Sequence, residues 1–313
     1  MSHLLITGGA GFIGSHIAEA LVADGHRVRI FDNLSSGHLH NLDHLKDRVE
    51  FVRGDVRDRA AIGTAMQGMT HCFHEAVLVS VFESVERPFD NHDINMSGTL
   101  NVLQAVRDAG VQRVVFASSA AIYGNDPELP KRETMRPQPA SPYAAGKITG
   151  EYYLSIFAQL YGVQTVSLRY FNVFGPRQDP KSMYSGVISK FTDDVKAGRA
   201  PTIFGDGQQT RDFVFVKDVV QANLKAMFGT KVGAGEACNV ATGQTASLLD
   251  MVRVLGELTG RTITPNFKDA RKGDIQHSSA DIAKARQLLG YEPKFTLKTG
   301  LQALLQSLGV PTV

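Results

Sequence analysis

The sequence predicts an α/β fold in which a doubly wound parallel sheet is followed by a smaller C-terminal α/β lobe. Short apolar or β-branched runs alternate with amphipathic helical stretches through the first half of the chain, as in successive βαβ units. A glycine-rich turn joins the first apolar run to a helical stretch, and glycine and proline become denser after residue 172. A chain of 313 residues is long enough for about two domains, which agrees with this division.

Six apolar runs are the expected parallel strands: Leu4–Thr7, Val28–Asp32, Val49–Gly54, His71–Ala76, Val114–Ser119 and Thr165–Tyr170. The helices expected between them are Gly14–Asp24, Ala60–Met66, Asn95–Ala109 and Pro142–Tyr161. Residues 1–170 are therefore predicted to form a Rossmann-like domain and residues 171–313 a second lobe. Two later runs, Asp212–Val216 and Glu236–Val240, are also expected to be strands. We expect one or both to return to the first sheet, so that a strand within 211–241 belongs to the first domain.

The overall charge gives no reason to expect binding to nucleic acid or to a membrane surface. The chain has 33 basic and 31 acidic residues, a net charge of +2, so an anionic ligand must be held by local contacts. The two cysteines, Cys72 and Cys238, lie in apolar segments and are expected to be free thiols in a reducing compartment. No signal peptide or membrane-spanning helix is expected, which favours a cytoplasmic protein.

A dinucleotide site is predicted at the first strand-to-helix turn. Leu4–Thr7 runs directly into a G-x-x-G-x-x-G sequence formed by Gly8, Gly11 and Gly14. Glycines at such a turn let the backbone approach a pyrophosphate at the N-terminus of the following helix.

Two acidic residues are expected at the adenosine end of the dinucleotide. Asp32 ends the second strand, where its carboxylate can accept hydrogen bonds from ribose hydroxyls and repel a 2′-phosphate, so NAD is favoured over NADP. Asp55 follows the third strand and can accept the adenine amino group, with Val56 packed on the ring. Asp55 could instead cap a turn or helix.

A hydroxyl, a phenol and an amine follow the pattern of a hydride-transfer site. Tyr143 and Lys147 stand four residues apart on a helix that Pro142 can start, so they share one face. A neighbouring ammonium is expected to lower the pKa of the Tyr143 phenol toward the working pH. Ser119 ends a strand at the carboxyl edge of the sheet and can bind the hydroxyl that reacts.

These residues resemble those of the UDP-hexose 4-epimerase branch of the extended short-chain dehydrogenases, and the resemblance covers essentially the whole chain. The motifs that carry it occur in the family's order: Thr7–Gly14, Asp32–Gly37, Gly54–Asp58, Asn95–Thr99, Ser118–Gly124, Tyr143 with Lys147, Arg169–Pro176 and Arg211–Phe213. The resemblance implies a seven-stranded Rossmann domain, a smaller nucleotide-sugar lobe and bound NAD.

The implied reaction is epimerisation at C4 through a transient 4-keto sugar. Tyr143 would deprotonate the 4-hydroxyl as hydride passes to NAD, and the ketone would turn and take the hydride back on its other face. Lys147 would hold the nicotinamide ribose, and Tyr170 would flank the nicotinamide. The cofactor contacts that the resemblance implies are Gly8, Gly11, Phe12, Ile13, Gly14, Asp32, Asn33, Ser35, Ser36, Gly37, Asp55, Val56, Ala76, Asn95, Tyr143, Lys147 and Tyr170.

The resemblance also implies a UDP-sugar site. Ser119 and Tyr143 would contact the sugar. The diphosphate would be bound by Asn172, Arg211 and Arg271. Ser278 falls where the family carries a gate beside the C2 substituent, and a small residue there is expected to admit UDP-N-acetylglucosamine and UDP-N-acetylgalactosamine as well as UDP-glucose and UDP-galactose. Val79 replaces a basic residue of some members, which is expected to weaken cofactor retention. The helices Asn95–Ala109 and Pro142–Tyr161 are expected to form a homodimer interface.

Three other functions stay open at this point. A decarboxylase or 4,6-dehydratase would need acidic residues where this chain has Ala120 and Ala121. A UDP-glucuronate 4-epimerase resembles this chain but carries an arginine where Asp179 stands. A non-catalytic NAD-binding Rossmann sensor would not need the Ser, Tyr and Lys set. No metal site is expected, because the sets His38, His40, His44 and His71, Cys72, His74 are best explained as structural.

Overall fold

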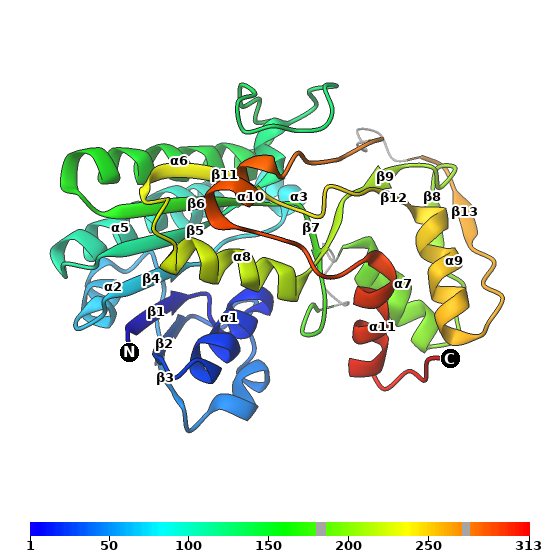
Figure 1. Ribbon diagram of the computed structural model, residues 1–313, viewed down its shortest axis with the longest axis horizontal. Helices are drawn as coiled ribbons and strands as arrows, with labels where there is room; N and C mark the ends of the chain where they lie inside the picture. Colours follow the sequence, from blue (N-terminus) through cyan, green and yellow to red (C-terminus); the bar gives the residue numbers. More distant parts are fainter. Residues whose placement is uncertain (180–185, 271–275) are drawn as a thin grey trace.

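A seven-stranded parallel sheet forms the centre of the computed structural model, which describes residues 1–179, 186–270 and 276–313 (Figure 1). The strand order is β11-β6-β5-β4-β1-β2-β3, and every neighbouring pair is parallel. The strands are β1 (His3–Thr7), β2 (Arg27–Asp32), β3 (Val49–Arg53), β4 (His71–His74), β5 (Arg113–Ser119), β6 (Gln164–Tyr170) and β11 (Ala234–Val240). The predicted doubly wound Rossmann-like sheet is confirmed.

Alternate residues of the central strands face opposite layers of helices. Leu4 and Ile6 of β1 pack in the core with α1 (Phe12–Ala23) and α8 (Val216–Phe228), whereas Leu5 packs in the core formed with α2 (Arg59–Met66), α5 (Gly98–Asp108) and α6 (Pro142–Tyr161). In β5, Val115 faces the first layer, and Val114 and Phe116 face the second. Because both faces of β1 and β5 are buried, consecutive residues in the middle of these strands are apolar, as expected of a parallel sheet.

Helix α6 carries clear signals at both of its ends. Ser141 is the N-cap, where its hydroxyl accepts a hydrogen bond from the Ala144 N–H at 3.2 Å, and Pro142 occupies the first turn. Gly162 ends the helix in the left-handed conformation, with φ of 69°. In the part of the chain that the structure describes, neither α6 nor any other helix is both long and apolar enough to cross a membrane.

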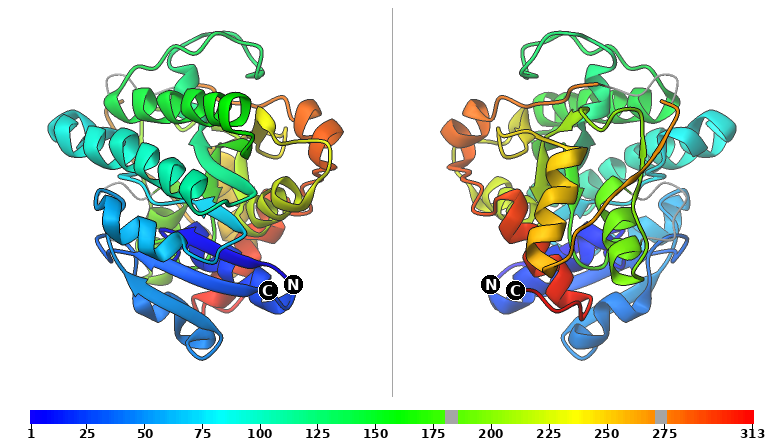
Figure 2. Two further views of the ribbon diagram at one scale, coloured as in Figure 1. Left: turned by 90° about the vertical axis from the view of Figure 1, so that its left-hand side faces the viewer. Right: turned by 90° about the vertical axis from the view of Figure 1, so that its right-hand side faces the viewer.

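The second lobe is a set of short strand pairs packed on helices (Figure 1, right). Its strand pairs are β7 (Asn172–Phe174) with β10 (Phe213–Phe215), β8 (Thr202–Phe204) with β13 (Asn266–Lys268), and β9 (Thr210–Arg211) with β12 (Ala246–Ser247). The helices that pack with them are α7 (Val187–Lys196), α9 (Leu248–Thr259) and α11 (Leu297–Ser307). Figure 2 shows the molecule from its two ends, with the sheet lobe and the second lobe in turn toward the viewer.

The chain crosses between the two lobes several times after β6. Of the two later strands expected from the sequence, Glu236–Val240 lies within β11 and pairs with β6, while Asp212–Val216 contains β10, which pairs with β7 outside the large sheet. Helix α8 and the later α10 (Ala283–Leu289) also pack in the core of the first lobe. The first lobe is therefore completed by residues from three separate regions beyond residue 170.

Two expected elements differ at their ends. The helix expected over Asn95–Ala109 begins as a π-helical turn, Asp93–Ser97, before α5 starts at Gly98. The strand expected over His71–Ala76 stops at His74. After that point the Glu75 N–H still donates to the Thr7 carbonyl at 3.1 Å, but the chain then turns across the glycine turn that follows β1.

The shorter remaining helices lie in connections. They are the 3₁₀ helices Leu39–Leu45 and Ala120–Tyr123, and the short α-helices α3 (Val81–Glu86) and α4 (Pro88–His92).

A glycine-to-alanine pair tests how closely α6 approaches the sheet. A Cβ at Gly150 would lie 2.6 Å from the buried Phe116 ring, so Gly150→Ala should lower the free energy of unfolding by about 1–3 kcal/mol through overpacking. The control is Gly63→Ala in α2, where a Cβ meets nothing within 4 Å. It should raise the free energy of unfolding by about 0.4–1 kcal/mol, because alanine has less conformational freedom in the unfolded chain. Denaturant titration measures both changes, and equal effects would contradict the close packing of α6 on β5.

Candidate functional site

The residues expected to bind the dinucleotide and to carry out chemistry gather at the carboxyl edge of the parallel sheet. This edge is where ligands bind in open α/β folds, because the loops that leave adjacent strands meet there. The expected residues lie at the ends of six neighbouring strands and in the turns after them: Gly8–Gly14 after β1, Asp32 in β2, Asp55 after β3, Ala76 after β4, Ser119 in β5 and Tyr170 in β6.

The turn after β1 has the close backbone approach that a pyrophosphate needs. Gly8 has φ of 68°, and its carbonyl accepts the Gly11 N–H at 3.1 Å. A Cβ at Gly14 would lie 2.4 Å from that same Gly8 carbonyl oxygen. Helix α1 starts directly afterwards with Phe12 and Ile13, and its N-cap Gly11 offers no side-chain cap. The first N–H groups of the helix are therefore left for an anionic ligand.

Asp32 holds the neighbouring loops together. Its carboxylate accepts the Ala10 N–H at 2.9 Å and the Leu34 N–H at 2.8 Å. The side chain is buried, and this burial raises the pKa of Asp32, although the two backbone hydrogen bonds oppose the shift. Gly37 lies against this carboxylate, because a Cβ there would be 3.0 Å from the Asp32 Oδ2 atom.

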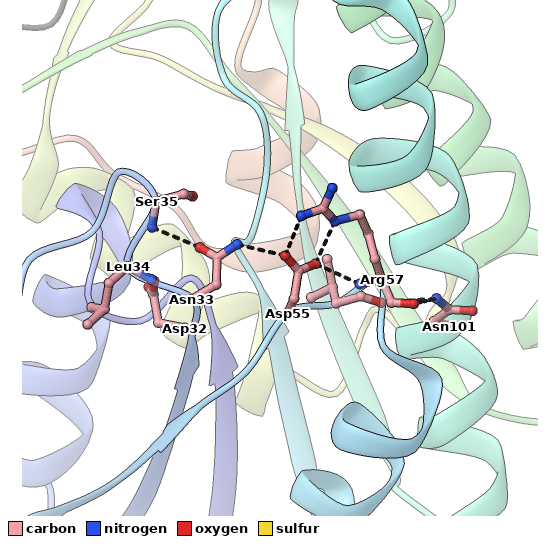
Figure 3. Close-up of polar contacts among 8 residues, drawn as sticks. Asp32, Asn33, Leu34, Ser35, Asp55, Arg57 and Asn101 are labelled. Carbon is pink, nitrogen blue, oxygen red and sulfur yellow. Dashed lines mark hydrogen bonds and ion pairs between the residues drawn. The ribbon is translucent and has the colours of Figure 1, made fainter.

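Asp55 is paired with side chains of two neighbouring loops (Figure 3). Its carboxylate accepts hydrogen bonds from the Asn33 amide at 2.9 Å and from the Arg57 guanidinium at 2.7 and 3.0 Å. The hydrogen bonds from Arg57 hold the pKa of Asp55 well below its usual range. Asn33 in turn accepts the N–H of Ser35, so it links the loops after β2 and β3. Sequence reasoning missed Arg57, because its pairing with Asp55 depends on side-chain geometry.

The other expected cofactor residues differ in burial and in hydrogen bonding. Val56 is buried and lies so close to Gly98 that a Cβ on this glycine would collide with it. The Ala76 N–H donates to the Thr7 hydroxyl, while Ser35 and Ser36 are exposed in the loop after β2. Asn95 has both amide atoms occupied, since it exchanges hydrogen bonds with the backbone of Leu78 at 2.9 and 3.1 Å. Asn95 thereby fixes the loop that follows β4.

Two adjacent serines at the end of β5 have different surroundings. Ser118 is buried and donates to Glu151, which also forms a bidentate ion pair with Arg169 at 2.7 and 2.9 Å. Ser119 is only half-buried, and its hydroxyl accepts the Ala121 N–H and interacts with Tyr143. Ser119 is therefore the serine beside the candidate catalytic tyrosine.

Tyr143 and Lys147 lie together on α6, as their spacing predicts. The Lys147 ammonium nitrogen is 5.7 Å from the centre of the Tyr143 ring, and it donates to the Ala117 carbonyl at 2.6 Å. The expectation that the pKa of Tyr143 would be lowered is wrong: burial raises it, and the hydrogen bond with Ser119 opposes the shift. Burial also lowers the pKa of Lys147 to about 8. The charged forms of both groups are costly here because water is excluded.

Glu75 is a buried acidic residue at the same edge that sequence reasoning did not single out. It follows β4 directly, and its carboxylate accepts a hydrogen bond from the Tyr170 hydroxyl at 3.0 Å. Burial raises the pKa of Glu75 to about 7. The available signal was a charged residue within the otherwise apolar run expected to be the fourth strand.

The second lobe brings three of the four expected diphosphate and sugar residues to adjoining segments. The Asn172 amide donates to the Asp212 carbonyl at 3.2 Å, next to Arg211 in β9. The Ser278 N–H donates to the Thr210 carbonyl at 3.1 Å, so the predicted gate is beside Arg211. Arg271 lies outside the described residues.

The structure also describes the residues on which the alternative functions and the possible metal site depended. Val79 and Asp179 are both exposed. His74 uses both ring nitrogens in hydrogen bonds with Thr7 and Thr99, and burial lowers its pKa to about 3. Within the described ranges, no group of three or more potential metal ligands is present.

Comparison with known proteins identifies the family. The model of the NAD-dependent epimerase/dehydratase family matches residues 4–241. The chain belongs to this family. It is 41% identical to the UDP-glucose 4-epimerase of Mycolicibacterium smegmatis, over 95% of each chain. Among solved structures, it is similar to the UDP-N-acetylglucosamine 4-epimerase of Methanobrevibacter ruminantium, with a TM-score of 0.93, 36% identity and 98% of each chain covered. It is also similar to the NAD complex of the Thermus thermophilus UDP-glucose 4-epimerase, with a TM-score of 0.88, 38% identity and coverage of 97% and 98%.

NAD is the cofactor of this family, and the carboxyl edge of the sheet fits it. The turn around Gly8 and Gly14 has no room for side chains, and the uncapped start of α1 suits a pyrophosphate. Asp32 places a carboxylate at the end of β2, where adenosine ribose hydroxyls can donate to its remaining lone pairs.

Selectivity for NAD over NADP should depend on the uncompensated charge of Asp32. We expect Asp32→Asn to raise the affinity for NADP relative to NAD by about tenfold, since it removes the repulsion of the 2′-phosphate. The control is Asp55→Asn, which should change the ratio by less than about twofold, because Arg57 already balances the charge of Asp55. Calorimetric titration of cofactor-free protein with NAD and NADP measures the ratio. An unchanged ratio in Asp32→Asn would show that another residue excludes NADP.

Proposed function

We propose that the protein is an NAD-dependent 4-epimerase of UDP-hexoses that interconverts UDP-glucose with UDP-galactose and UDP-N-acetylglucosamine with UDP-N-acetylgalactosamine. The observation that carries the proposal is the arrangement of Tyr143 beside Ser119 and Lys147 at the ligand-binding edge of the sheet. The relatives in this family support it, since their names include both UDP-glucose and UDP-N-acetylglucosamine 4-epimerases.

Tyr143 is the proposed base. Burial raises the pKa of its phenol, and the hydrogen bond with Ser119 favours the tyrosinate, the form that takes the proton of the sugar's 4-hydroxyl. Ser119 orients that hydroxyl by a hydrogen bond. NAD, when bound, supplies the acceptor and later the donor of the hydride at C4. Tyr143 then returns its proton to the oxygen of the 4-keto sugar, so the protein ends the cycle in its starting protonation state.

The second lobe is proposed to hold the UDP part while the sugar turns. Asn172 and Arg211 lie on adjoining segments that can bind the diphosphate, and Arg271 is proposed to share this role. Contacts confined to the nucleotide leave the hexose free to present either face of C4 to the same Tyr143.

The surroundings of Ser119 favour simple epimerisation over the related reactions. Ala120 and Ala121 follow Ser119 in a 3₁₀ turn and provide no acid or base for elimination or decarboxylation. Asp179 would repel the carboxylate of a glucuronate sugar. A sensor that only bound NAD would have no use for the Ser119, Tyr143 and Lys147 set.

We also propose a homodimer formed through α5 and α6. Tyr152, Ile156 and Leu160 recur every four residues along one face of α6 and are exposed, and Leu100 on α5 is exposed too. Helical residues at this spacing form an apolar stripe that a second copy of the chain can cover.

The central experiment is incubation of the purified protein with UDP-glucose and, separately, with UDP-N-acetylglucosamine. We expect anomeric-proton NMR to detect both 4-epimers with no added reductant. Tyr143→Phe should lower turnover by about 10²- to 10⁴-fold because it removes the base and little contact area. Tyr152→Phe, an exposed tyrosine of the same helix, is the control and should retain turnover. NADH accumulating in step with consumption of the sugar, without epimer, would indicate a dehydrogenase instead.

Substrate breadth is proposed to depend on the small side chain of Ser278. Ser278→Tyr should abolish most activity on UDP-N-acetylglucosamine and spare UDP-glucose, since the larger side chain would overlap an acetamido group. His277→Tyr places the same tyrosine side chain at the adjacent exposed position and should affect neither substrate. The ratio of kcat/KM for the two sugars is the measurement. Equal losses on both substrates in Ser278→Tyr would rule out the gate.

A further inference from the structure

The predicted gate residue Ser278 lies in a short segment whose start is held by the second lobe. We call residues 276–281 the gate segment; it belongs to the orange chain that enters α10 in Figure 1. Thr210 of β9 donates its N–H to the Gln276 carbonyl at 2.9 Å and accepts the Ser278 N–H at 3.1 Å. Arg211 is the next residue of β9, so the start of the gate segment lies against the strand that carries this arginine.

The end of the gate segment is held by the first lobe. The Lys131 N–H donates to the Ser279 carbonyl at 2.9 Å, and the Asp281 N–H donates back to the Lys131 carbonyl at 2.9 Å. Lys131 belongs to the loop that follows the 3₁₀ turn after Ser119. The gate segment therefore bridges the strand that carries Arg211 and the loop that leaves the candidate catalytic serine.

One buried side chain joins the two partners of this second attachment. Asn239 of β11 is fully buried, and its amide nitrogen donates to the carbonyls of Lys131 at 2.9 Å and of Asp281 at 3.1 Å. Its backbone N–H donates to the Glu133 carboxylate at 2.7 Å, which adds a further contact with the same loop. The backbone bridge between the loop and the gate segment is isolated from any longer strand, so these side-chain bonds are a large share of what holds it.

The orientation of the Asn239 amide is set by a chain of hydrogen bonds that begins on α6. Arg169 forms the bidentate ion pair with Glu151 of α6 and donates to the Tyr123 hydroxyl at 2.9 Å. A guanidinium cannot accept a hydrogen bond, so the proton of the Tyr123 hydroxyl is donated to the Asn239 side-chain oxygen at 2.7 Å. The Asn239 NH₂ group is thereby turned toward the two backbone carbonyls.

This chain of hydrogen bonds connects the candidate catalytic helix with the gate segment without a break. The side chains of Glu151, Arg169, Tyr123 and Asn239 are all buried, and each is bonded to the next. Buried polar groups that are fully paired in this way hold one geometry, because any displacement leaves a donor or acceptor without a partner.

We propose that Asn239 is a positioning residue that sets the place of the sugar gate relative to the carboxyl edge of the sheet. The inference rests on the proposed function, because the gate matters only if the hexose lies between Ser278 and Tyr143. A sugar held by its diphosphate must present C4 to Tyr143, and a displacement of about 1 Å can cost about 100-fold in rate. Asn239 acts through the gate segment and does not itself touch the reacting atoms.

Hydrogen exchange tests the attachment without depending on turnover. Asn239→Leu keeps the size of the side chain and removes its hydrogen bonds. In the NAD-bound protein without sugar, mass spectrometry should show about tenfold faster exchange in peptides that contain Lys131 and residues 278–281. Peptides of β1 should be unchanged. Unchanged exchange in the gate segment would overturn the role of Asn239.

The matched control for exchange is Thr165→Val. The Thr165 hydroxyl donates to the Leu154 carbonyl at 2.9 Å, so this change also removes a buried bond from a side chain to the backbone. Thr165 lies near the start of β6, at the opposite edge of the sheet from Ser119. Thr165→Val should leave exchange of the gate segment at the wild-type rate.

Kinetics then separate positioning from a purely structural role. Asn239→Leu should lower kcat on UDP-glucose, per NAD-bound protein, by about 10- to 100-fold. The Kd values of UDP and of NAD should each change less than about twofold, because β9 stays paired with β12 and the glycine turn is untouched. A purely structural role would lower the melting temperature and leave kcat per NAD-bound protein unchanged, which would overturn the proposal.

Tyr123→Phe gives a second, milder test in case Asn239→Leu does not fold. It removes only the hydroxyl that orients the amide, so exchange of the gate segment should rise and kcat should fall by about two- to tenfold. Wild-type values of both in Tyr123→Phe would overturn the proposal. Faster exchange in the gate segment of a protein that epimerises no UDP-sugar would support the attachment by Asn239 and refute the proposed function alone.

Discussion

The buried ion pair between Glu151 and Arg169 is the interaction on which the geometry of the site depends. It joins α6 to β6, and the same Glu151 carboxylate accepts the hydroxyl of Ser118 at the end of β5. Arg169 also donates to Tyr123, which lies in the 3₁₀ turn after Ser119. Removing one partner of such a pair costs about 3–5 kcal/mol because a charge is left buried. The pair therefore fixes the helix that carries Tyr143 and Lys147 relative to the strand that carries Ser119.

This arrangement explains why two adjacent residues in the sequence have different surroundings. Ser118 and Ser119 are chemically identical, but side chains of a strand alternate between its two faces, so only one can reach the Glu151 pair. Lys147 and Glu151 are four residues apart on α6 and consequently lie on the same side of the helix. Lys147 and the glutamate of the ion pair therefore lie on neighbouring turns of the same helix.

The fold and the proximity of Tyr143 to Lys147 could be predicted because they depend on local patterns. The apolar runs of the sheet, the glycine turn after β1 and the Tyr143/Lys147 spacing all lie within short segments. The pairing of Asp55 with Arg57 and the bonds of Asn95 to Leu78 could not be predicted, since they are set by which rotamer reaches which loop. The raised pKa of Tyr143 depends on burial by segments distant in sequence. The strands of the second lobe are two or three residues long, too short for a period to be recognised.

The return of β11 to the edge of the sheet has a consequence for how the protein is made. When residue 170 leaves the ribosome, β6 has a neighbour on one side only, and its other edge presents unpaired N–H and C=O groups. That edge is not covered until residues 234–240 arrive, after β7, α7 and β10 of the second lobe have been synthesised. The sheet of the first lobe is therefore completed only after part of the second lobe has been synthesised. Nascent chains therefore carry an open strand edge during this interval.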